Sequence, residues 1–182
     1  MAAPLYALVA YETGPVAGFV EGLRRQFHPK QAHLPAHLSL LPPRRLQGTE
    51  QQALDTLESV CAEVEPFEIV LGEVASFVPV TATVFLRVAH AAYRMRELHD
   101  RLNVGTLRCE EQWPYMPHLT IFKMDTVEES LPALEEARRR WEEYRETRRV
   151  LIERLTFVRE AGPNCWTDLA PVPLGRRLAP TR

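Results

Sequence analysis

The apolar residues in the first half of the chain follow two patterns. Short apolar or alternating runs are typical of strands, whereas apolar residues three to four apart are typical of amphipathic helices. The sequence therefore predicts strands at residues 5–10, 37–41, 67–77 and 81–89, and helices at residues 15–27 and 49–63. Thr49 is a suitable N-cap for the second helix. Pro42-Pro43 is expected to end the second strand, and a turn at Pro79 to join the last two strands as a hairpin.

The second half repeats part of this order. Its pattern predicts a helix at residues 90–103, a strand at 118–123, a long charged helix at 127–148, and closing strands within 149–160 and 165–174. Thr126 and Glu129 match a capping box at the start of the charged helix. In each half, strand-like sequence follows the helix that comes after a histidine-containing strand. We therefore expect two similar α+β lobes in one domain spanning 1–182, with 176–182 as a frayed tail.

Composition and charge narrow the class of protein. The 182 residues suffice for one domain with a proper core. The net charge of -2 gives no overall attraction to nucleic acid, so any contact with a polyanion must be local. No apolar stretch reaches the roughly 20 residues of a membrane span, and the N-terminus lacks the basic region of a signal peptide. We expect no membrane association.

The cysteines and the charged helix have ordinary explanations. Cys61, Cys109 and Cys165 are widely spaced and form no CxxC pair, which argues against a disulfide framework or a zinc site and suits a reducing cytoplasm. The run EEARRRWEEYRETRR at 135–149 resembles a basic nucleic-acid surface at first sight. Because Glu and Arg stand three to four apart, a solvated helix face with internal ion pairs is the better interpretation.

Two short motifs carry the chemical signal: PAHLSLLPP at 35–43 and MPHLTIFK at 116–123. Each contains histidine, an aliphatic residue, a hydroxyl residue and another aliphatic residue. Side chains alternate across a strand, so His37 and Ser39 share one face, and His118 and Thr120 share another. Two such matches are expected by chance only about once in a thousand chains of this composition. The pair indicates a polar cleft between the lobes.

Two imidazoles and two hydroxyls facing one cleft suit the hydrolysis of a phosphodiester. Histidine titrates near pH ~6.5, so one ring can be neutral and the other protonated near neutrality. The neutral ring takes a proton from the attacking water, and the protonated ring gives one to the departing oxygen. The hydroxyls donate hydrogen bonds to the phosphate oxygens, where charge develops. This scheme requires no metal or other cofactor.

The paired motifs resemble those of the two-histidine phosphoesterase superfamily, and especially its bacterial branch of 2'-5' RNA ligase-like proteins and RNA 2',3'-cyclic phosphodiesterases. The resemblance covers about residues 4–172 and implies an α+β, bilobal fold, with mainly antiparallel sheets around a central cleft and helices outside. It implies His37 and His118 as the acid/base pair, with Ser39 and Thr120 as phosphate ligands. The implied substrates are 2',3'-cyclic phosphates and 2'-5' linkages in a nucleotide or an RNA terminus.

Further residues are candidates on weaker grounds. Basic residues often follow the motifs in the ligase-like branch, which makes Arg44 and Lys123 local candidates for phosphate binding. The sequence departs from that branch at Pro42-Pro43, where a longer apolar strand end is expected, so the mouth of the cleft can differ. Trp113 and Tyr115 precede the second motif and can either stack a base at the cleft rim or pack against the loop. The low basic content favours a small nucleotide or an RNA end over long RNA.

Other aromatic and histidine residues are expected to be structural. Phe77 and Trp166 are expected in the core, and His90 and His99 on the surface or in local hydrogen bonds. A metal site formed by the three histidines of 28–37 is disfavoured, because Pro29 and Pro35 interrupt any helix that would align them and no carboxylate is near in the sequence.

Three functions remain open on the sequence. The leading hypothesis is a monomeric, metal-independent phosphodiesterase without an obligate protein partner. A module that binds a nucleotide or RNA end without significant turnover is the first alternative. The second is a 2'-5' RNA ligase, in which a 5'-hydroxyl replaces water and the same residues serve the reverse reaction. A metal-dependent hydrolase is the outsider.

Overall fold

The computed structural model describes residues 3–175, and these form one eight-stranded antiparallel sheet with four α-helices. The strands are β1 (Tyr6–Tyr11), β2 (His37–Arg44), β3 (Phe67–Ser76), β4 (Thr83–His90), β5 (His118–Lys123), β6 (Arg149–Ile152), β7 (Arg154–Gly162) and β8 (Cys165–Pro173). The helices are α1 (Pro15–Phe27), α2 (Glu50–Cys61), α3 (Ala92–Leu102) and α4 (Val127–Glu143), with short 3₁₀ turns at Pro29–Gln31 and Gly105–Leu107. The expected frayed tail, 176–182, lies outside the described residues.

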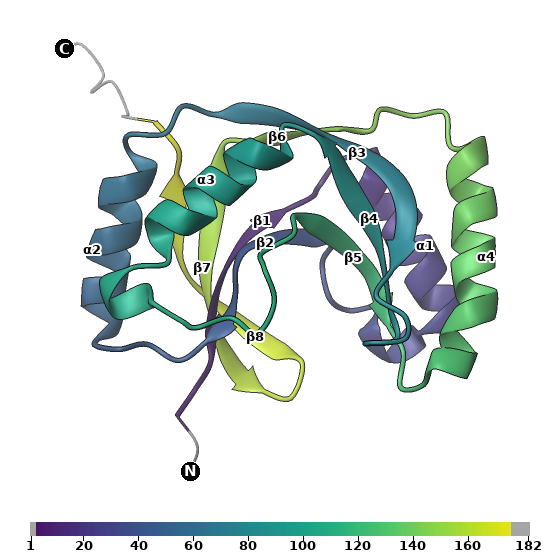
Figure 1. The fold of residues 1–182 in the computed structure, drawn as a ribbon, viewed down its shortest axis with the longest axis horizontal. Helices are drawn as coiled ribbons and strands as arrows, with labels where there is room; N and C mark the ends of the chain where they lie inside the picture. Colours follow the sequence, from purple (N-terminus) through teal and green to yellow (C-terminus); the bar gives the residue numbers. More distant parts are fainter. Residues whose placement is uncertain (1–2, 176–182) are drawn as a thin grey trace.

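The sheet has two similar halves that meet at the two motif strands. The strand order is β6-β3-β4-β5-β2-β1-β7-β8, so β5 ends one half and β2 begins the other. Across this junction one residue pair, Leu38 with Leu119, stands in register, whereas the pairs within each half are extensive. The sheet curls between the two pairs of helices (Figure 1). The expectation of an α+β fold with two lobes and outer helices is confirmed.

The lobes are not the two halves of the sequence. In the order β3-β4-β5-β2-β1-β7, the unit β1-α1-β2-α2-β3 and the unit β4-α3-β5-α4-β7 occupy equivalent positions. However, α1 packs on β5 and α3 packs on β2, so each unit places its first helix on the other unit's motif strand. Figure 1 shows the result, with α1 and α4 together on one side and α2 and α3 together on the other. The two sequence halves are therefore interleaved.

Three predicted boundaries were wrong. The segment 149–160 is two strands rather than one, because the chain breaks at Glu153 and crosses from β6 beside β3 to β7 beside β1. The charged helix ends at Glu143, before the expected residue 148. Strand β2 runs through Pro42-Pro43 to Arg44. Prolines are tolerated there because β5 has already diverged, which leaves that edge of β2 without ladder hydrogen bonds to lose.

Local signals and surface charge agree with the sequence. Thr49 and Gln52 form a complete capping box at α2, and the Thr126 side chain accepts a hydrogen bond from the Glu129 amide at α4. The Glu and Arg residues of α4 form ion pairs with one another, as expected. In the described part of the chain all three cysteines are free.

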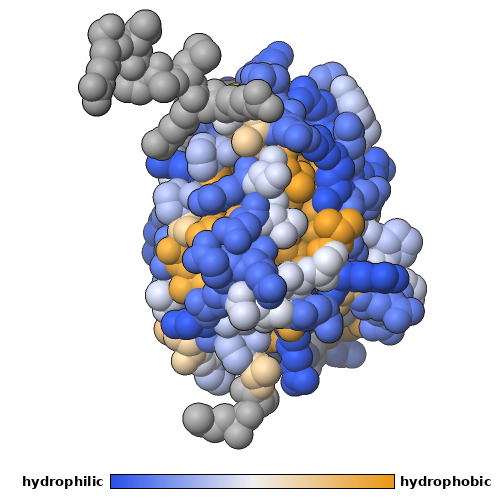
Figure 2. Space-filling model, turned by 90° about the vertical axis from the view of Figure 1, so that its left-hand side faces the viewer, coloured by the Kyte–Doolittle hydropathy of each residue, from blue (hydrophilic) through white to orange (hydrophobic). Residues whose placement is uncertain are grey.

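Apolar side chains fill the space between the sheet and its helices. Leu38 and Leu40 of β2, Leu119 and Ile121 of β5, and Leu23 of α1 are all fully buried there. Outside this core, the face that carries α2 is mostly hydrophilic, with hydrophobic residues gathered in a band near its middle (Figure 2). No helix within residues 3–175 is long and apolar enough to cross a membrane.

Candidate active site

The two motifs lie side by side at the junction of the lobes. Because Leu38 and Leu119 are partners in antiparallel strands, His37 stands opposite Thr120 and Ser39 stands opposite His118. Directly opposed residues point to the same face of a sheet. The two leucines are fully buried on the helix-covered face, so the imidazoles and hydroxyls all emerge on the other, concave face. The structure thus brings together the four residues that the sequence grouped.

Each histidine ring is held by a hydrogen bond to the backbone just before its strand. His37 Nδ1 lies 2.9 Å from the Pro35 carbonyl oxygen, and His118 Nδ1 lies 2.7 Å from the Met116 carbonyl oxygen. A carbonyl oxygen only accepts, so Nδ1 carries the proton in both rings. Nε2 is then the atom that can accept or release a proton. The two rings are equivalent in this respect, which matches the equivalence of the two structural units.

Burial lowers the pKa of both histidines from the ordinary value. For His118 the hydrogen bond to Met116 opposes this effect. For His37 burial is again the largest cause, the hydrogen bond to Pro35 opposes it, and the charges of Arg24 and His118 lower the pKa further. The neighbours also differ: His118 makes edge contacts with the rings of Phe77 and Phe85 at 5.2 and 5.1 Å. His37 instead faces the Tyr11 ring at 6.5 Å.

Arg24 connects strand β5 to the loop that precedes β2, and sequence reasoning missed it. Its guanidinium donates to the carbonyl oxygens of Ile121 at 2.6 Å, Thr120 at 2.8 Å and Leu34 at 2.5 Å. The side chain is buried on α1, and burial lowers its pKa to about 10, so it remains charged at neutral pH. An arginine beside Leu23 on the apolar face of an amphipathic helix was the signal available in the sequence.

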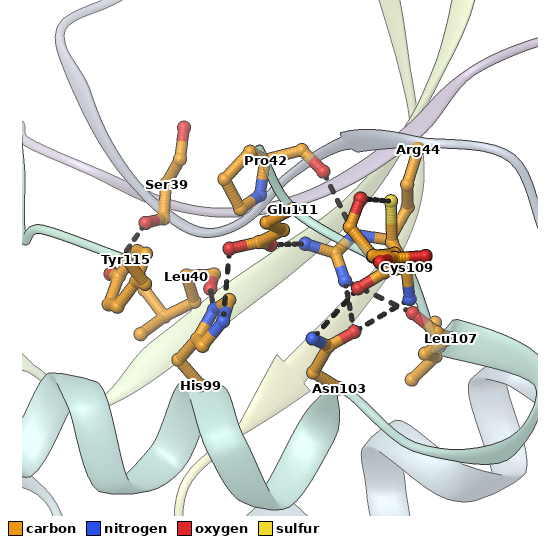
Figure 3. Close-up of polar contacts among 11 residues, drawn as sticks. Ser39, Leu40, Pro42, Arg44, His99, Asn103, Leu107, Cys109, Glu111 and Tyr115 are labelled. Carbon is orange, nitrogen blue, oxygen red and sulfur yellow. Dashed lines mark hydrogen bonds and ion pairs between the residues drawn. The ribbon is translucent and has the colours of Figure 1, made fainter. Parts of the chain in front are cut away.

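Arg44 lies away from the concave face that carries the motif side chains, in a network that occupies its guanidinium (Figure 3). It donates to Pro42 O, Asn103 Oδ1 and Leu107 O, and its Nη2 lies 2.5 Å from Glu111 Oε1. The residue is 3% exposed. The expected contact between Arg44 and phosphate does not fit this structure, because β2 has turned its end toward α3 and the loop before β5.

His99 and Tyr115 belong to the same network, which corrects the expectation for His99 and bears on the two alternatives for Tyr115. His99 is buried rather than on the surface, and its bonds are not local: Nδ1 contacts the Leu40 carbonyl oxygen at 2.7 Å and Nε2 lies 3.4 Å from Glu111. The Tyr115 ring stacks on His99 with centroids 4.0 Å apart, and its hydroxyl donates to the Ser39 carbonyl oxygen at 2.7 Å. Tyr115 is therefore engaged in packing, which is one of the two alternatives that the sequence left open. Figure 3 shows it fastening the second motif's loop to β2.

The remaining candidates divide between the surface and the concave face. Trp113 is 62% exposed, which leaves its indole available to a ligand. Lys123 is exposed and stands opposite Thr83 at the end of β5. Phe77 is half-buried against Phe85 and His118, at the site rather than in the main core. Trp166 is also half-buried and packs against a small separate cluster on the concave side of β1 and β7.

A cavity of about 460 Å³ opens at Tyr11, the residue opposite His37 on strand β1, and nothing in the sequence pointed to it. It is lined by polar side chains of Tyr11, Thr13, Glu153, Arg154, Thr156 and Asp168, together with apolar groups of β6 and β8. Tyr11 donates from its hydroxyl to Asp168 Oδ1 at 2.6 Å. Burial, and then this hydrogen bond, raise the Tyr11 pKa above its ordinary value. Residues 3–175 contain no group of three or more His, Cys, Asp or Glu side chains placed to hold a metal ion.

Comparisons with known proteins agree with this arrangement. The sequence matches the family model described as "2'-5' RNA ligase superfamily" over residues 13–164. A protein of Oceanobacillus iheyensis named "Putative phosphoesterase" is 24% identical over 175 residues, which cover 94% of this chain and 98% of that protein.

Solved structures show the same fold at low identity. The TT0787 structure from Thermus thermophilus has a TM-score of 0.65 at 16% identity, over 96% of this chain and 100% of that one. The structure of E. coli LigT complexed with NADP+ has a TM-score of 0.62 at 14% identity, over 96% and 99% of the two chains. With both motifs on one face and the family match spanning them, the chain belongs to the 2'-5' RNA ligase superfamily.

Proposed function

We propose that this protein is a metal-independent phosphodiesterase that hydrolyses a 2',3'-cyclic phosphate or a 2'-5' linkage of a nucleotide or RNA end. The observation that carries the proposal is the register at Leu38 and Leu119, which sets His37 beside Thr120 and His118 beside Ser39. The names of the relatives support phosphoester chemistry. LigT structures are described as complexes with NADP+, ATP, 3'-AMP and phosphate, which supports a nucleotide ligand.

The reaction needs one neutral and one protonated imidazole. The neutral ring accepts a proton at Nε2 from water as the water oxygen bonds to phosphorus. The bond from phosphorus to the departing ribose oxygen breaks, and the protonated ring gives its Nε2 proton to that oxygen. The product is a phosphomonoester, and the two rings exchange protonation states over one turnover.

The side chains around the phosphate supply the remaining stabilisation. The hydroxyls of Ser39 and Thr120 donate to non-bridging oxygens, where negative charge increases in the transition state. Lys123, at the end of β5 on the same side as Thr83, adds a mobile positive charge. The exposed Trp113 is the remaining candidate for stacking a base.

The test is turnover of the four nucleoside 2',3'-cyclic monophosphates in the presence of excess chelator. Wild type, His37→Ala and His118→Ala are compared with His90→Ala, which replaces an exposed histidine at the far end of β4. We expect turnover in wild type and the control, and a loss of at least a hundredfold in each motif variant.

The other outcomes assign the alternatives. Activity that the chelator abolishes would contradict metal independence. No turnover of cyclic nucleotides or RNA ends, with ligand affinity unchanged in the motif variants, would favour the binding module. Joining of a 5'-hydroxyl end to a cyclic phosphate end would establish ligation.

A further inference from the structure

We propose that the cavity at Tyr11 binds the uncharged nucleoside part of the substrate while the phosphate lies at the two motifs. This inference rests on the proposed function, since it places the substrate's phosphate at His37 and His118. It adds a location for the rest of the molecule and a preference about its charge.

The cavity lies next to the motif strand β2, on the same face of the sheet. Tyr11 stands opposite His37 in the pairing of β1 with β2, and Val9, opposite Ser39, stands opposite Thr156 of β7. Tyr11 and Thr156 both line the cavity. Neighbouring strands are about 4.8 Å apart, so the cavity begins one strand away from the imidazole. A group attached to a phosphate at His37 can therefore reach the cavity past Tyr11, which lies between them.

The size of the cavity suits a nucleoside. Its volume of about 460 Å³ lies within the range of small-molecule sites, roughly 300–1,000 Å³. Leu151, Leu169 and Pro171 offer apolar surface along its wall, which suits the flat face of a base. The opposite side of the motif face offers less room, because Phe77 and Phe85 pack against each other and against His118.

The polar groups of the cavity favour hydrogen-bond donors over a second phosphate. Glu153 and Asp168 contribute two carboxylates, and Arg154 contributes one guanidinium. Tyr11 holds Asp168 through Oδ1, which orients the carboxylate and leaves its second oxygen to accept from a ligand. Carboxylates accept from ribose hydroxyls and from the N–H groups of bases, but they repel an additional phosphate. The cavity therefore selects the nucleoside itself.

The experiment measures binding to the full chain by calorimetry, so it does not depend on turnover. The probes are the four nucleoside 3'-monophosphates, one matching 3',5'-bisphosphate, and inorganic phosphate. Ala170→Trp fills the cavity from β8, Asp168→Ala removes the oriented acceptor, and Thr167→Ala is the matched control at an exposed neighbouring position.

We expect wild type to bind at least one 3'-monophosphate at least tenfold more tightly than inorganic phosphate. Ala170→Trp should remove this advantage, Asp168→Ala should reduce it at least fivefold, and Thr167→Ala should preserve it. All four proteins should bind inorganic phosphate equally, which also establishes that the variants fold. If Ala170→Trp fails to fold, Asp168→Ala decides the matter alone.

Three results would overturn the inference: no advantage of 3'-monophosphate over phosphate in wild type, equal weakening of both ligands in the cavity variants, or a bisphosphate bound much more tightly than the monophosphate. The proposed function is tested separately. It fails if wild type shows no turnover, or if the turnover is the same in His37→Ala as in wild type.

Discussion

Replacing Arg24 by methionine removes the guanidinium that links β5 to the loop before β2 while keeping a side chain of similar length. Three carbonyl oxygens, on Thr120, Ile121 and Leu34, then lose a charged donor in a site where the arginine is 3% exposed. A buried polar group without a partner costs about 1–3 kcal/mol. Losing the buried cation also removes the cost of its desolvation, which offsets part of the total cost of the three unpaired carbonyl groups. We expect a net loss of about 3 kcal/mol in the free energy of unfolding.

Urea denaturation measures this loss. With a slope of about 2 kcal/mol per molar for a domain of this size, the midpoint should fall by about 1.5 M. Arg24→Lys should lose about half as much, because an ammonium keeps the charge but cannot reach three carbonyls in a fork. Arg25→Met is the matched control, since the Arg25 side chain is 65% exposed and forms only a 3.8 Å pair with Glu21. A loss below about 1 kcal/mol for Arg24→Met would refute the role of Arg24 as the link between β5 and the loop before β2.

The other predictions concern pH and the buried network. Burial lowers the pKa of His37 and His118, so kcat/KM for a cyclic nucleotide should decline about tenfold per pH unit on the alkaline side, with its midpoint below ~6.5; a flat profile up to pH 8 would contradict this. In the same window the unfolded chain binds more protons than the folded one, so the free energy of unfolding should fall as pH drops below ~6.5. The urea midpoint should therefore be lower at pH 5 than at pH 7.5, and the difference should be smaller in the variant that lacks both histidines. Arg44→Met leaves the Glu111 carboxylate without its arginine partner and should cost about 3 kcal/mol of stability. The control Arg45→Met, at an exposed position, should cost little. KM should be unchanged in Arg44→Met, and a raised KM would instead place Arg44 at the phosphate site. Tyr115→Phe should cost about 1 kcal/mol of stability through its lost hydrogen bond to Ser39, and an unchanged urea midpoint would contradict this role.

Strand alternation was enough to place the motif side chains. The pattern of His, Leu, hydroxyl and Leu or Ile fixes which residues face the core, because Leu38 and Leu119 can be buried only if His37 and His118 emerge on the other side. The fold class followed from the same periodicity and from the resemblance it revealed. These are local properties, and each depends on neighbours within a few residues.

What the sequence did not reveal depends on contacts between distant segments. Glu153 interrupts an unbroken strand-like pattern because the two sides of the break pair with strands at different places in the sheet, β3 and β1. The fate of Arg44 is decided by Asn103 and Glu111, about sixty residues away. The cavity has the same origin, since its walls come from β1, β6, β7 and β8. Periodicity carries no information about such pairings.

The position of β1 has a consequence for synthesis on the ribosome. This strand lies between β2 and β7, and its pairing with β7 joins Tyr6–Val9 to Thr156–Arg159. One edge of an apolar strand therefore stays open until the distant strand β7 has been translated. Open apolar edges template association with other chains. We expect the nascent protein to need chaperone protection until β7 emerges, and the native sheet to form only afterwards.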